Sequence, residues 1–403
     1  MDLKDAKRFF SCVLGDPPPV SCKICLWDGA ELSFGGQGPA FILRVNDPDV
    51  LDKLFNADPS LAFGEAYMSG GMDVEGDLGQ LVSLVYRTDL HSMPFGKRAR
   101  MCWLGIKGKA RNIRQSRRDI QTHYDRGNDF YRLWLDEGLS YSCAFFSSPD
   151  DALEEAQKGK IAYTLHKLRL KPGHRLLDIG CGWGSLAIQA AKTYDCRVVG
   201  LTISEQQYEL ARKRVEEQGL SDRVDIRLQD YRELPPSESG TFDRIVSVGM
   251  FEHVGKENIP VFFKTASGFL RPKGLMLLHT IGRMRPIDMD AWIMTYIFPG
   301  SYIPAVREVT EAAQIHGLDF IDMEDLRPHY DLTLSHWIRR FEAHVGKIRD
   351  MMGERFVRMW RLYLNGSQMA FRYADMHVFQ FLYSLGRRRD MPLTRRWLTE
   401  MNL

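Results

Sequence analysis

Glu252 and His253 place a carboxylate and an imidazole side by side in VGMFEHVG (248–255), at the end of a run that otherwise reads as a buried strand. Burying an unpaired carboxylate costs on the order of several kcal/mol. The pattern therefore indicates either chemistry at Glu252 or a carboxylate that caps the helix after it. We expect His253 to be structural or to act only through a neighbouring residue, because adjacent strand residues point to opposite faces.

A glycine-rich loop, DIGCGWG, spans Asp178 to Gly184 at the end of another apolar run. Its glycines permit a tight turn and a close approach to a ligand, which could be a dinucleotide. Two details favour S-adenosylmethionine instead. Asp178 stands two positions before Gly180, in the D-x-G-x-G-x-G pattern of methyltransferases that use this cofactor, and the next strand ends in GLT (200–202) without an acidic residue.

Further polar groups follow the next two predicted strands. Thr202, Ser204 and Gln206 stand in TISEQQ, where the commoner methyltransferase pattern has an acid that binds ribose. Ser204 is also placed to cap the helix that follows. Asp230 and Tyr231 come after the third strand, where an acid beside an aromatic ring could hold the adenine amino group and ring face. The alternative for this pair is an ordinary polar strand end.

The elements that position these groups begin near residue 123, where apolar runs of strand length alternate with helical patterns. This alternation predicts an α/β fold with a largely parallel sheet and helices on both faces. Ligands of such sheets bind beyond the carboxyl ends of the strands. We therefore expect one cleft at the ends of HRLLDIG, RVVGLTI, FDRIVSVGMFEH and GLMLLHTIG.

A chain of 403 residues exceeds one comfortable core, so we expect two domains. Residues 1–96 are predicted to form a small α+β domain, and residues 123–403 the larger one. In the small domain, DG at 28–29 indicates a hairpin turn and DP at 47–48 a helix start. AFILRV is predicted as a strand, DLGQLVSLVYR as a helix and GEAYMSGGMDVEG as irregular.

The predicted linker, 97–122, is basic. Residues 97–118 contain nine basic and no acidic side chains, with tryptophan, leucine and isoleucine among them. A solvated linker would have this composition, but the apolar residues favour an anionic membrane surface, where each cation adds roughly 1 kcal/mol. No stacking platform or known module suggests a nucleic-acid partner.

The targeting features point to peripheral membrane contact. No apolar run approaches the ~20 residues that span a bilayer, and the charges in MDLKDAKRFF argue against a signal peptide. Seven scattered cysteines form no disulfide framework and indicate a reducing compartment. We expect a cytoplasmic protein at the inner face of the cell membrane.

Metal binding is not indicated. Cys22 and Cys25 form a single CxxC pair, which we interpret as two small strand residues, because a zinc site needs further ligands. No other spacing of histidine, cysteine, aspartate and glutamate requires a metal.

Several motifs recur in an order and at spacings that resemble the cyclopropane-fatty-acid synthase family. They are HYDRGNDFYRLWLDEGLSYSCAFF, LLDIGCGWG, VVGLTISEQQ, RIVSVGMFEHVG, LLHTIG, YIFPGSYIPA and HYDLTL, and they extend from about His123 to about Ala374. GEAYMSGGMDVEGD resembles the smaller domain of the long bacterial members. The resemblance implies a Rossmann-like methyltransferase with a seven-stranded, largely parallel sheet. It also implies a smaller N-terminal α+β domain, residues 1–96, that contributes to lipid engagement, and a homodimer.

The resemblance also implies a reaction. S-adenosylmethionine would supply a methylene group across the cis double bond of a phospholipid acyl chain, with bicarbonate as the base. The implied bicarbonate ligands are Cys143, Glu252, His279, Ile281 and Tyr330. The implied cofactor contacts are Tyr141, Ser142, Asp178, Gly180, Gly182, Thr202, Ser204, Gln206, Gln207, Asp230 and Tyr231.

The chemistry of this reaction gives Glu252 a role. An alkene is a poor nucleophile and must be held in line with the sulfonium methyl in a dry site. Its methylation produces a carbocation, and ring closure requires loss of a proton from the new methyl group. We predict that Glu252 orients the bicarbonate while His279, Tyr330 and backbone N–H groups donate to it. Cys143 has no activating base nearby in sequence and is expected to line the site.

The acyl site and the alternatives stay open. Residues 290–306, DAWIMTYIFPGSYIPAV, contain prolines that exclude one continuous helix, and both a tunnel wall and ordinary core fit them. Rival functions are a small-amine methyltransferase, a lipid methylase that leaves a methyl branch or methylene group, and a catalytically silent lipid-binding protein. The complete set of implied anion ligands argues against the first, and the intact glycine loop against the last.

Overall fold

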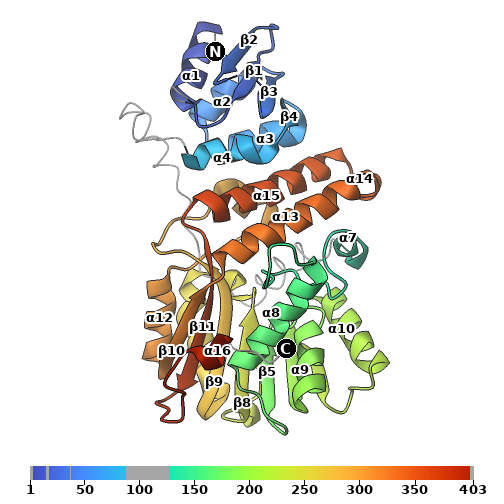
Figure 1. Cartoon of the computed structure of the whole chain (residues 1–403), viewed down its shortest axis with the longest axis vertical. Coiled ribbons are helices and arrows are strands. Elements are labelled where there is room, and N and C mark those ends of the chain that lie inside the picture. Colours follow the sequence, from blue (N-terminus) through green and yellow to red (C-terminus); the bar gives the residue numbers. More distant parts are fainter. Residues whose placement is uncertain (1–2, 15–17, 37, 88–126, 400–403) are drawn as a thin grey trace. The chain divides into compact units, whose positions relative to one another are not determined.

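The computed structural model of the chain describes residues 3–14, 18–36, 38–87 and 127–399. It divides into two compact units, each described by itself below (Figure 1). Of the described residues, the small unit comprises those from 3 to 87, 288–299 and 337–375, and the large unit comprises residues 127–287, 300–336 and 376–399. Two segments beyond residue 123 thus group with the N-terminal residues. The predicted boundaries at 96 and 122, and the basic run between them, lie outside the described residues.

The small unit contains a four-stranded sheet in the order β2-β1-β3-β4. Its strands are β1 (Cys22–Cys25), β2 (Glu31–Phe34), β3 (Phe41–Val45) and β4 (Met72–Gly76). The predicted hairpin joins β1 and β2, with Gly29 at a φ of +85° and Asp28 Oδ1 accepting a hydrogen bond from the Ala30 N–H at 3.0 Å. Cys22 and Cys25 are free, buried residues of β1, as predicted.

The small unit also contains helices that pack on this sheet and on one another. They are α1 (Leu3–Leu14), α2 (Asp49–Asn56), α3 (Pro59–Ser69), α4 (Leu78–Arg87), a π-helical turn (Ile293–Ile297), α14 (Val345–Met352) and α15 (Glu354–Tyr373). The predicted helices starting near residues 48 and 78 are confirmed by α2 and α4. Helix α13 (Arg327–Ala343) has residues in both units.

The prediction that GEAYMSGGMDVEG is irregular was wrong, because α3 and β4 occupy it. Asp58 caps α3 by accepting a hydrogen bond from the Leu61 N–H, and Gly70 ends the helix at a φ of +83°. Position 64 in α3 requires glycine, because a Cβ there would lie only 2.1 Å from Cδ1 of Trp292. These glycines therefore allow close packing and end the helix. From composition alone, they suggest irregular structure.

The large unit is built on a seven-stranded sheet in the order β10-β11-β9-β8-β5-β6-β7. Its strands are β5 (Arg175–Ile179), β6 (Arg197–Thr202), β7 (Val224–Leu228), β8 (Phe242–Val248), β9 (Leu270–Gly282), β10 (Leu318–Asp325) and β11 (His377–Leu385). Strand β11 runs antiparallel to both neighbours, and the other pairings are parallel. The predicted fold class is confirmed.

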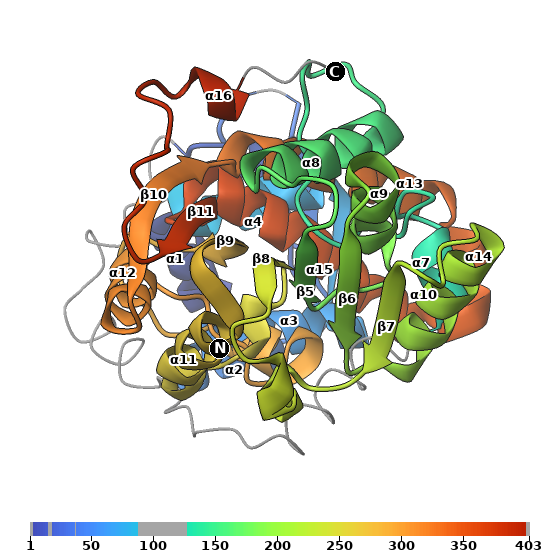
Figure 2. The same ribbon diagram turned by 90° about the horizontal axis from the view of Figure 1, so that it is seen from below.

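Helices cover both faces of this sheet (Figure 2). They are α8 (Leu153–Lys167), α9 (Ser185–Tyr194), α10 (Glu205–Glu217), α11 (Ile259–Phe269) and α12 (Val306–Ile315), and the unit also contains α7 (Asn128–Arg132) and α16 (Arg396–Thr399). Leu176 of β5 packs in a core with α8, α9 and α10, whereas its neighbour Leu177 packs in a second core with α11 and α12. Burial on both faces explains why the strands read as continuous apolar runs.

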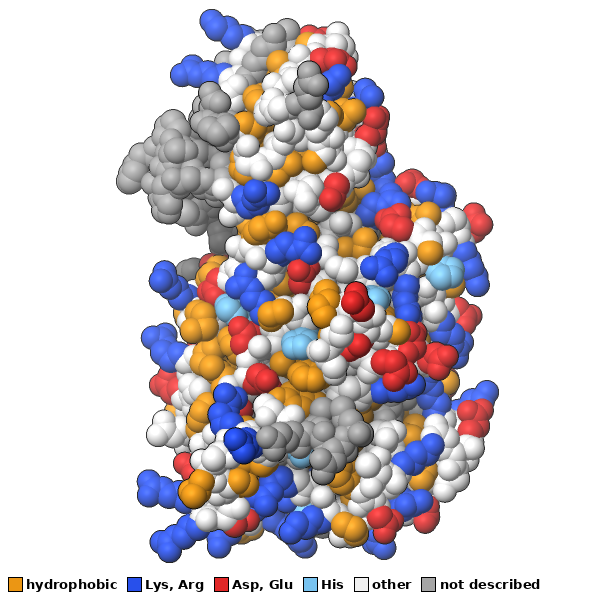
Figure 3. Space-filling model, viewed as in Figure 1, with side chains coloured by type: hydrophobic (Ala, Val, Ile, Leu, Met, Phe, Trp, Pro, Cys, Tyr) orange, Lys and Arg blue, Asp and Glu red, His pale blue; other side chains and the backbone are white. Residues whose placement is uncertain are grey.

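On the face of the large unit seen in Figure 3, Lys and Arg side chains are interspersed with Asp and Glu. Such mixed charge is typical of the surface of a globular protein.

Within the described part of the chain, no helix has the length and apolar character that crossing a membrane requires.

Helix α8 carries a row of polar side chains that are buried. Gln157, Lys160, Thr164 and Lys167 are each no more than 4% exposed. Their spacing of three or four residues places them along one side of the helix. Because buried polar groups need partners, this row requires acceptors and donors from neighbouring elements.

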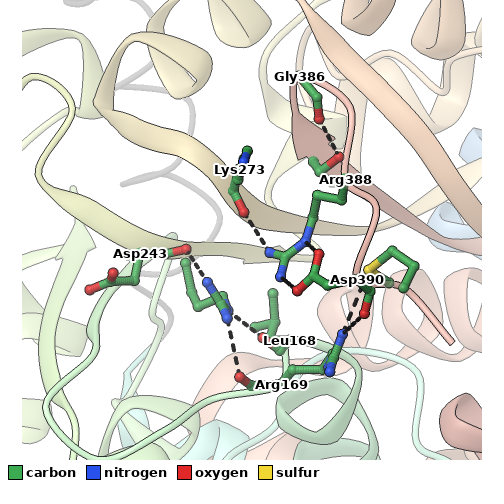
Figure 4. Close-up of polar contacts among 10 residues, drawn as sticks. Leu168, Arg169, Asp243, Lys273, Gly386, Arg388 and Asp390 are labelled. Atoms are coloured by element: carbon green, nitrogen blue, oxygen red, sulfur yellow. Dashed lines mark hydrogen bonds and ion pairs between the residues drawn. The ribbon is translucent and has the colours of Figure 1, made fainter.

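The end of α8 is held by Arg244 of β8. Its guanidinium donates to the carbonyl oxygen of Leu168 and, at 3.2 Å, to that of Arg169. The guanidinium of Arg169 donates in turn to the carbonyl oxygen of Asp390 at 3.2 Å, and the Asp390 carboxylate pairs with Arg388 (Figure 4). Arg244 thereby satisfies carbonyls that a helix end leaves without a partner inside the helix.

Candidate active site

A cavity opens at the carboxyl ends of β5, β6, β7 and β8, as expected for a sheet of this kind. The end of β9, which we expected to share the cleft, does not line it. Ser204 and Gln206 do not line it either. The predicted cofactor residues that do are Tyr141, Ser142, Asp178, Gly180, Gly182, Thr202, Gln207, Asp230 and Tyr231.

The glycine loop closes tightly on the end of β8. Gly180 has a φ of +84°, and a Cβ at this position would lie 2.6 Å from Met250 Cβ. Any other residue would be strained and would displace Met250. The loop therefore keeps its backbone exposed to the cavity, where a ligand can approach it closely.

Asp178 and Lys160 are two buried charged groups on the cavity wall. Asp178 is 2% exposed, and its Oδ2 has no hydrogen-bond partner among the described residues. Burial raises the pKa of Asp178 to about 7, and the nearby Lys160 opposes this. Lys160 donates from Nζ to Ser142 Oγ at 3.0 Å, and burial lowers its pKa. Sequence reasoning did not identify Lys160.

The segment 138–142 forms another wall of the cavity. Asp136 holds it by accepting hydrogen bonds from the N–H groups of Gly138 at 2.8 Å and Ser140 at 2.7 Å. Gln157 of α8 donates to the carbonyl oxygen of Ser142 at 2.9 Å. Asp136, from just before the segment, and Gln157, from α8, thus fix the backbone beside Tyr141.

The TISEQQ segment turns from β6 into α10. Thr202 Oγ1 donates to Gln207 Oε1 at 2.8 Å, so both side chains are fixed at the cavity. Ser204 is fully buried and caps α10 by accepting a hydrogen bond from the Gln207 N–H. The capping role of Ser204 is therefore confirmed, and contacts of Ser204 and Gln206 with the cofactor stay predictions.

Asp230 and Tyr231 lie at the cavity after β7. The Asp230 carboxylate pairs with Arg232, accepting from its guanidinium at 2.7 Å and from its backbone N–H at 2.9 Å. Tyr231 packs edge-on against Phe262 of α11, with ring centroids 5.5 Å apart. An adenine amino group at Asp230 would share the carboxylate with Arg232, a partner that sequence reasoning missed.

Glu252 lies in a short 3-10 turn, Phe251–His253, directly after β8. Its side chain turns back to β9, where Oε1 accepts a hydrogen bond from the Ile281 N–H at 2.6 Å. Glu252 is 8% exposed, and Oε2 has no partner among the described residues. Burial raises the pKa of this carboxyl, and the Ile281 N–H opposes it. The Glu252 side chain therefore contacts β9 and does not cap the helix that follows it.

The same turn removes the basis of the expectation for His253, whose role stays a prediction. That expectation assumed that residues 252 and 253 continue a strand and point to opposite faces. Because they lie in a 3-10 turn, the strand rule does not apply, and His253 lines the cavity. The glycines at 249 and 255, which flank the turn, could have signalled the end of the strand.

His279 lies on β9, two residues before Ile281, and is 2% exposed. Its Nδ1 is 3.2 Å from Nε2 of Gln380, the residue opposite it on β11. Burial lowers the pKa of His279 to about 3, and the charges of Lys160 and Lys167 lower it further. The imidazole is therefore neutral near pH 7.

Cys143 and Tyr330 both lie at the start of α13, Cys143 beside it and Tyr330 within it. Cys143 is 1% exposed, and burial raises the pKa of its thiol far above the ordinary value, which does not suit a nucleophile. The next residue, Ala144, donates its N–H to Thr333 Oγ1 in α13 at 3.0 Å. Tyr330 lies one turn earlier in α13 and is 8% exposed.

The predicted anion ligands are thus brought together in part. Glu252 and Ile281 are in direct contact, and His279 lies on the same strand as Ile281. The Ile281 N–H already donates to Glu252, so in this state it is engaged in holding the carboxylate. The contacts given above place Cys143 and Tyr330 at α13: Ala144, next to Cys143, donates to Thr333 of this helix, and Tyr330 is one of its residues.

Comparison with known proteins gives the family. The family model described as "Mycolic acid cyclopropane synthetase" matches residues 111–381. The chain belongs to this family. A second model, described as "Domain of unknown function (DUF7884)", matches residues 9–94.

Relatives of this family member match nearly its whole length. It is 39% identical to the cyclopropane-fatty-acyl-phospholipid synthase of Escherichia coli (strain K12) over 371 residues, covering 91% of this chain and 93% of the relative. It is 37% identical to a probable fatty acid methyltransferase of Pseudomonas putida, covering 93% and 95%.

A solved relative has the same catalytic fold. The mycolic acid cyclopropane synthase CmaA1, complexed with SAH and CTAB, is 36% identical, with a TM-score of 0.63 and coverage of 66% of this chain and 98% of that chain. The family member is an S-adenosylmethionine-dependent methyltransferase of the cyclopropane synthase type.

Proposed function

We propose that this enzyme transfers a methylene group from S-adenosylmethionine across the cis double bond of a phospholipid acyl chain, with bicarbonate as the base. The observation that carries the proposal is the hydrogen bonding of the Glu252 carboxylate. This carboxylate is buried, with Oε1 held by the Ile281 N–H and Oε2 without a partner among the described residues. Such an oxygen requires a donor, and the hydroxyl of bicarbonate is one.

The other residues of the site fit the same anion. A neutral His279 and the phenol of Tyr330 can each donate one hydrogen bond to it. The buried Cys143 lines the site as a thiol. Low exposure of Glu252, His279 and Cys143 excludes bulk water, which strengthens each electrostatic interaction. When bound, bicarbonate supplies the base that removes a proton from the substrate.

The proposed reaction has two steps. The alkene attacks the sulfonium methyl in line, the carbon–sulfur bond breaks, and its electron pair stays on sulfur to give S-adenosylhomocysteine. The cation left on the acyl chain loses a proton from the new methyl group as the second ring bond forms. Glu252 holds the base in one orientation, and its negative charge stabilises the cation.

The cofactor would occupy the cavity at β5 to β8. Asp178 Oδ2 is free to accept a hydrogen bond from the ligand, and the backbone at Gly180 lets it approach closely. Tyr141 and Ser142 border the same cavity next to Cys143, so a cofactor bound there lies near the predicted anion site.

The test is mass spectrometry of acyl chains after the protein is incubated with S-adenosylmethionine and cis-unsaturated phospholipid vesicles. We expect a gain of one CH2 with loss of the olefin. A gain of CH2 with the double bond retained would point to a methylene or methyl-branched lipid. No change in the lipid, with methylation of an added amine, would replace the proposal with a small-molecule methyltransferase.

We further propose that the enzyme works as a cytoplasmic homodimer at the inner face of the cell membrane. The support for the membrane is the basic run 97–118 together with the word phospholipid in the name of the Escherichia coli relative, and the support for the dimer is the family resemblance alone. Reversing the charges of Arg111, Arg114 and Arg117 should weaken sedimentation with anionic vesicles and leave cofactor binding intact. Unchanged sedimentation would contradict the membrane role, and a monomer in analytical ultracentrifugation would contradict the dimer.

A further inference from the structure

Behind His279 lies a chain of buried polar groups that the proposed reaction does not itself use. Lys167 of α8 donates to Gln380 Oε1 at 2.8 Å and to the carboxylate of Glu324. Nε2 of Gln380 lies 3.2 Å from His279 Nδ1 and donates to Thr164 Oγ1 at 3.3 Å. The side chain of Lys167 is 2% exposed, and Gln380 is 1% exposed.

The orientation of the Gln380 amide follows from the chemistry of its neighbours. A lysine ammonium only donates hydrogen bonds, so the amide atom facing Lys167 must be the oxygen. The reverse orientation would place an NH2 group against the ammonium, donor against donor. The amide nitrogen therefore faces His279 and Thr164, and its two hydrogens serve those two acceptors.

This orientation determines which imidazole nitrogen carries the proton. A nitrogen that accepts from an amide N–H has a free lone pair, so Nδ1 of His279 is unprotonated. The neutral ring then carries its proton on Nε2, on the side away from Gln380. Burial keeps the ring neutral by lowering the pKa of His279 to about 3.

Glu324 keeps the lysine in place. Its Oε2 accepts hydrogen bonds from Lys167 and, at 2.8 Å, from the hydroxyl of Tyr163. Lys167 Nζ also lies 4.1 Å from the centroid of the Tyr163 ring. Burial lowers the pKa of Lys167, while Glu324 raises it and so favours the charged donor.

We propose that Lys167 and Gln380 are positioning residues that hold His279 as the Nε2–H tautomer, so that the ring is a hydrogen-bond donor toward a bound anion. The anion itself rests on the proposed function, but the tautomer does not. The two residues act through His279, not on the substrate.

The test is 15N NMR of the imidazole rings in uniformly labelled protein, with the His279 signals identified by their loss in His279→Asn. We expect an unprotonated Nδ1 and a protonated Nε2 from pH 6 to pH 8, in the absence of lipid and cofactor. In Gln380→Glu, Nδ1 should become protonated, because a carboxylate accepts and does not donate. A protonated Nδ1 in the unmodified protein, or an Nδ1 unaffected in Gln380→Glu, would overturn the proposal.

Lys167→Met and Lys158→Met provide a second measurement. Lys158 lies on the same helix, and its side chain is 71% exposed. With Lys167→Met we expect signals from both tautomers and about a tenfold rise in the bicarbonate concentration needed for half-maximal rate, with unchanged affinity for S-adenosylhomocysteine. Lys158→Met should change neither. If no ring product forms but the tautomer is as stated, the proposed function fails and the assignment of the tautomer stands.

Discussion

Two lysines on one side of α8 differ in their surroundings. Lys160 borders the cofactor cavity and donates to the hydroxyl of Ser142. Lys167 lies behind His279 and is bound by Glu324 and Gln380. Burial lowers the pKa of both. The difference is that Lys167 has a carboxylate in contact, whereas the contact described for Lys160 is a neutral hydroxyl.

This difference separates two regions of the large unit. The cofactor cavity has charged groups with unused capacity, such as Asp178 Oδ2, which suits a site that a polar ligand completes. The region behind His279 is already satisfied, because Lys167 and Gln380 both have hydrogen-bond partners. We interpret the first as a binding region and the second as a support that fixes one catalytic ring.

The largest expected effect concerns Asp178 and pH. Its pKa is about 7 in the folded protein, above the ordinary value of 3.8, so the folded state binds more protons than the unfolded state between these values. The free energy of unfolding of the cofactor-free protein should therefore fall as pH rises from 4 to 7, by at most about 4 kcal/mol from this group. Asp178→Asn should remove that part of the decrease in urea titrations. An identical pH dependence in the variant would contradict the assignment.

Glu252→Gln should affect the anion region and leave the cofactor cavity intact. In the proposed mechanism this charge orients the base and stabilises the cation, so its loss should lower turnover roughly 100-fold or more, the scale typical of losing one preorganised electrostatic group. Affinity for S-adenosylhomocysteine, measured by calorimetry, should not change. Glu257→Gln, a matched change at an exposed residue five positions on, should behave like the unmodified enzyme. Near-normal turnover of Glu252→Gln would contradict the role of Glu252.

Arg244→Met should weaken both regions, because Arg244 holds the end of the helix that carries both lysines. The carbonyl oxygens of Leu168 and Arg169 would lose a charged donor, which should lower the free energy of unfolding by about 2 kcal/mol in urea. Arg212→Met changes an arginine whose side chain is 53% exposed and should have little effect. Equal stability of the two variants would show that Arg244 does not support α8.

Lys160→Met should have the smallest effect and should be confined to the cofactor cavity. Its loss removes the donor to Ser142 and raises the pKa of Asp178 further, because Lys160 lowers that pKa. We expect about tenfold weaker binding of S-adenosylhomocysteine, with the tautomer of His279 unchanged in NMR. A changed tautomer with normal cofactor binding would reverse our assignment of the two lysines.

The two regions also differ in how far the sequence predicts them. The cavity at the ends of β5 to β8 is formed by loops that follow parallel strands, so local patterns such as DIGCGWG predicted many of the residues that line it. The support behind His279 is formed by pairs distant in the chain: His279 and Gln380 are 101 positions apart, and Lys167 and Gln380 are 213 apart. Without an alignment, local pattern does not predict such pairs.

Predictions from local sequence patterns also failed where the packing or the backbone turn of the folded chain determined the structure. Glycines suggested an irregular segment where α3 forms, because Gly64 gives room to Trp292. Strand alternation did not apply to His253, because a 3-10 turn begins at Phe251. One usable signal was overlooked: Gln157, Lys160, Thr164 and Lys167 repeat at helical spacing on a side of α8 that is buried.

The measurement that tests the central claim most directly is the initial rate of ring formation as a function of bicarbonate in buffers depleted of carbon dioxide. We predict a rate that rises from near zero and saturates, with Glu252→Gln failing to reach the unmodified rate at any concentration. A full rate in depleted buffer would contradict bicarbonate as the base and would require a side chain of the enzyme to remove the proton.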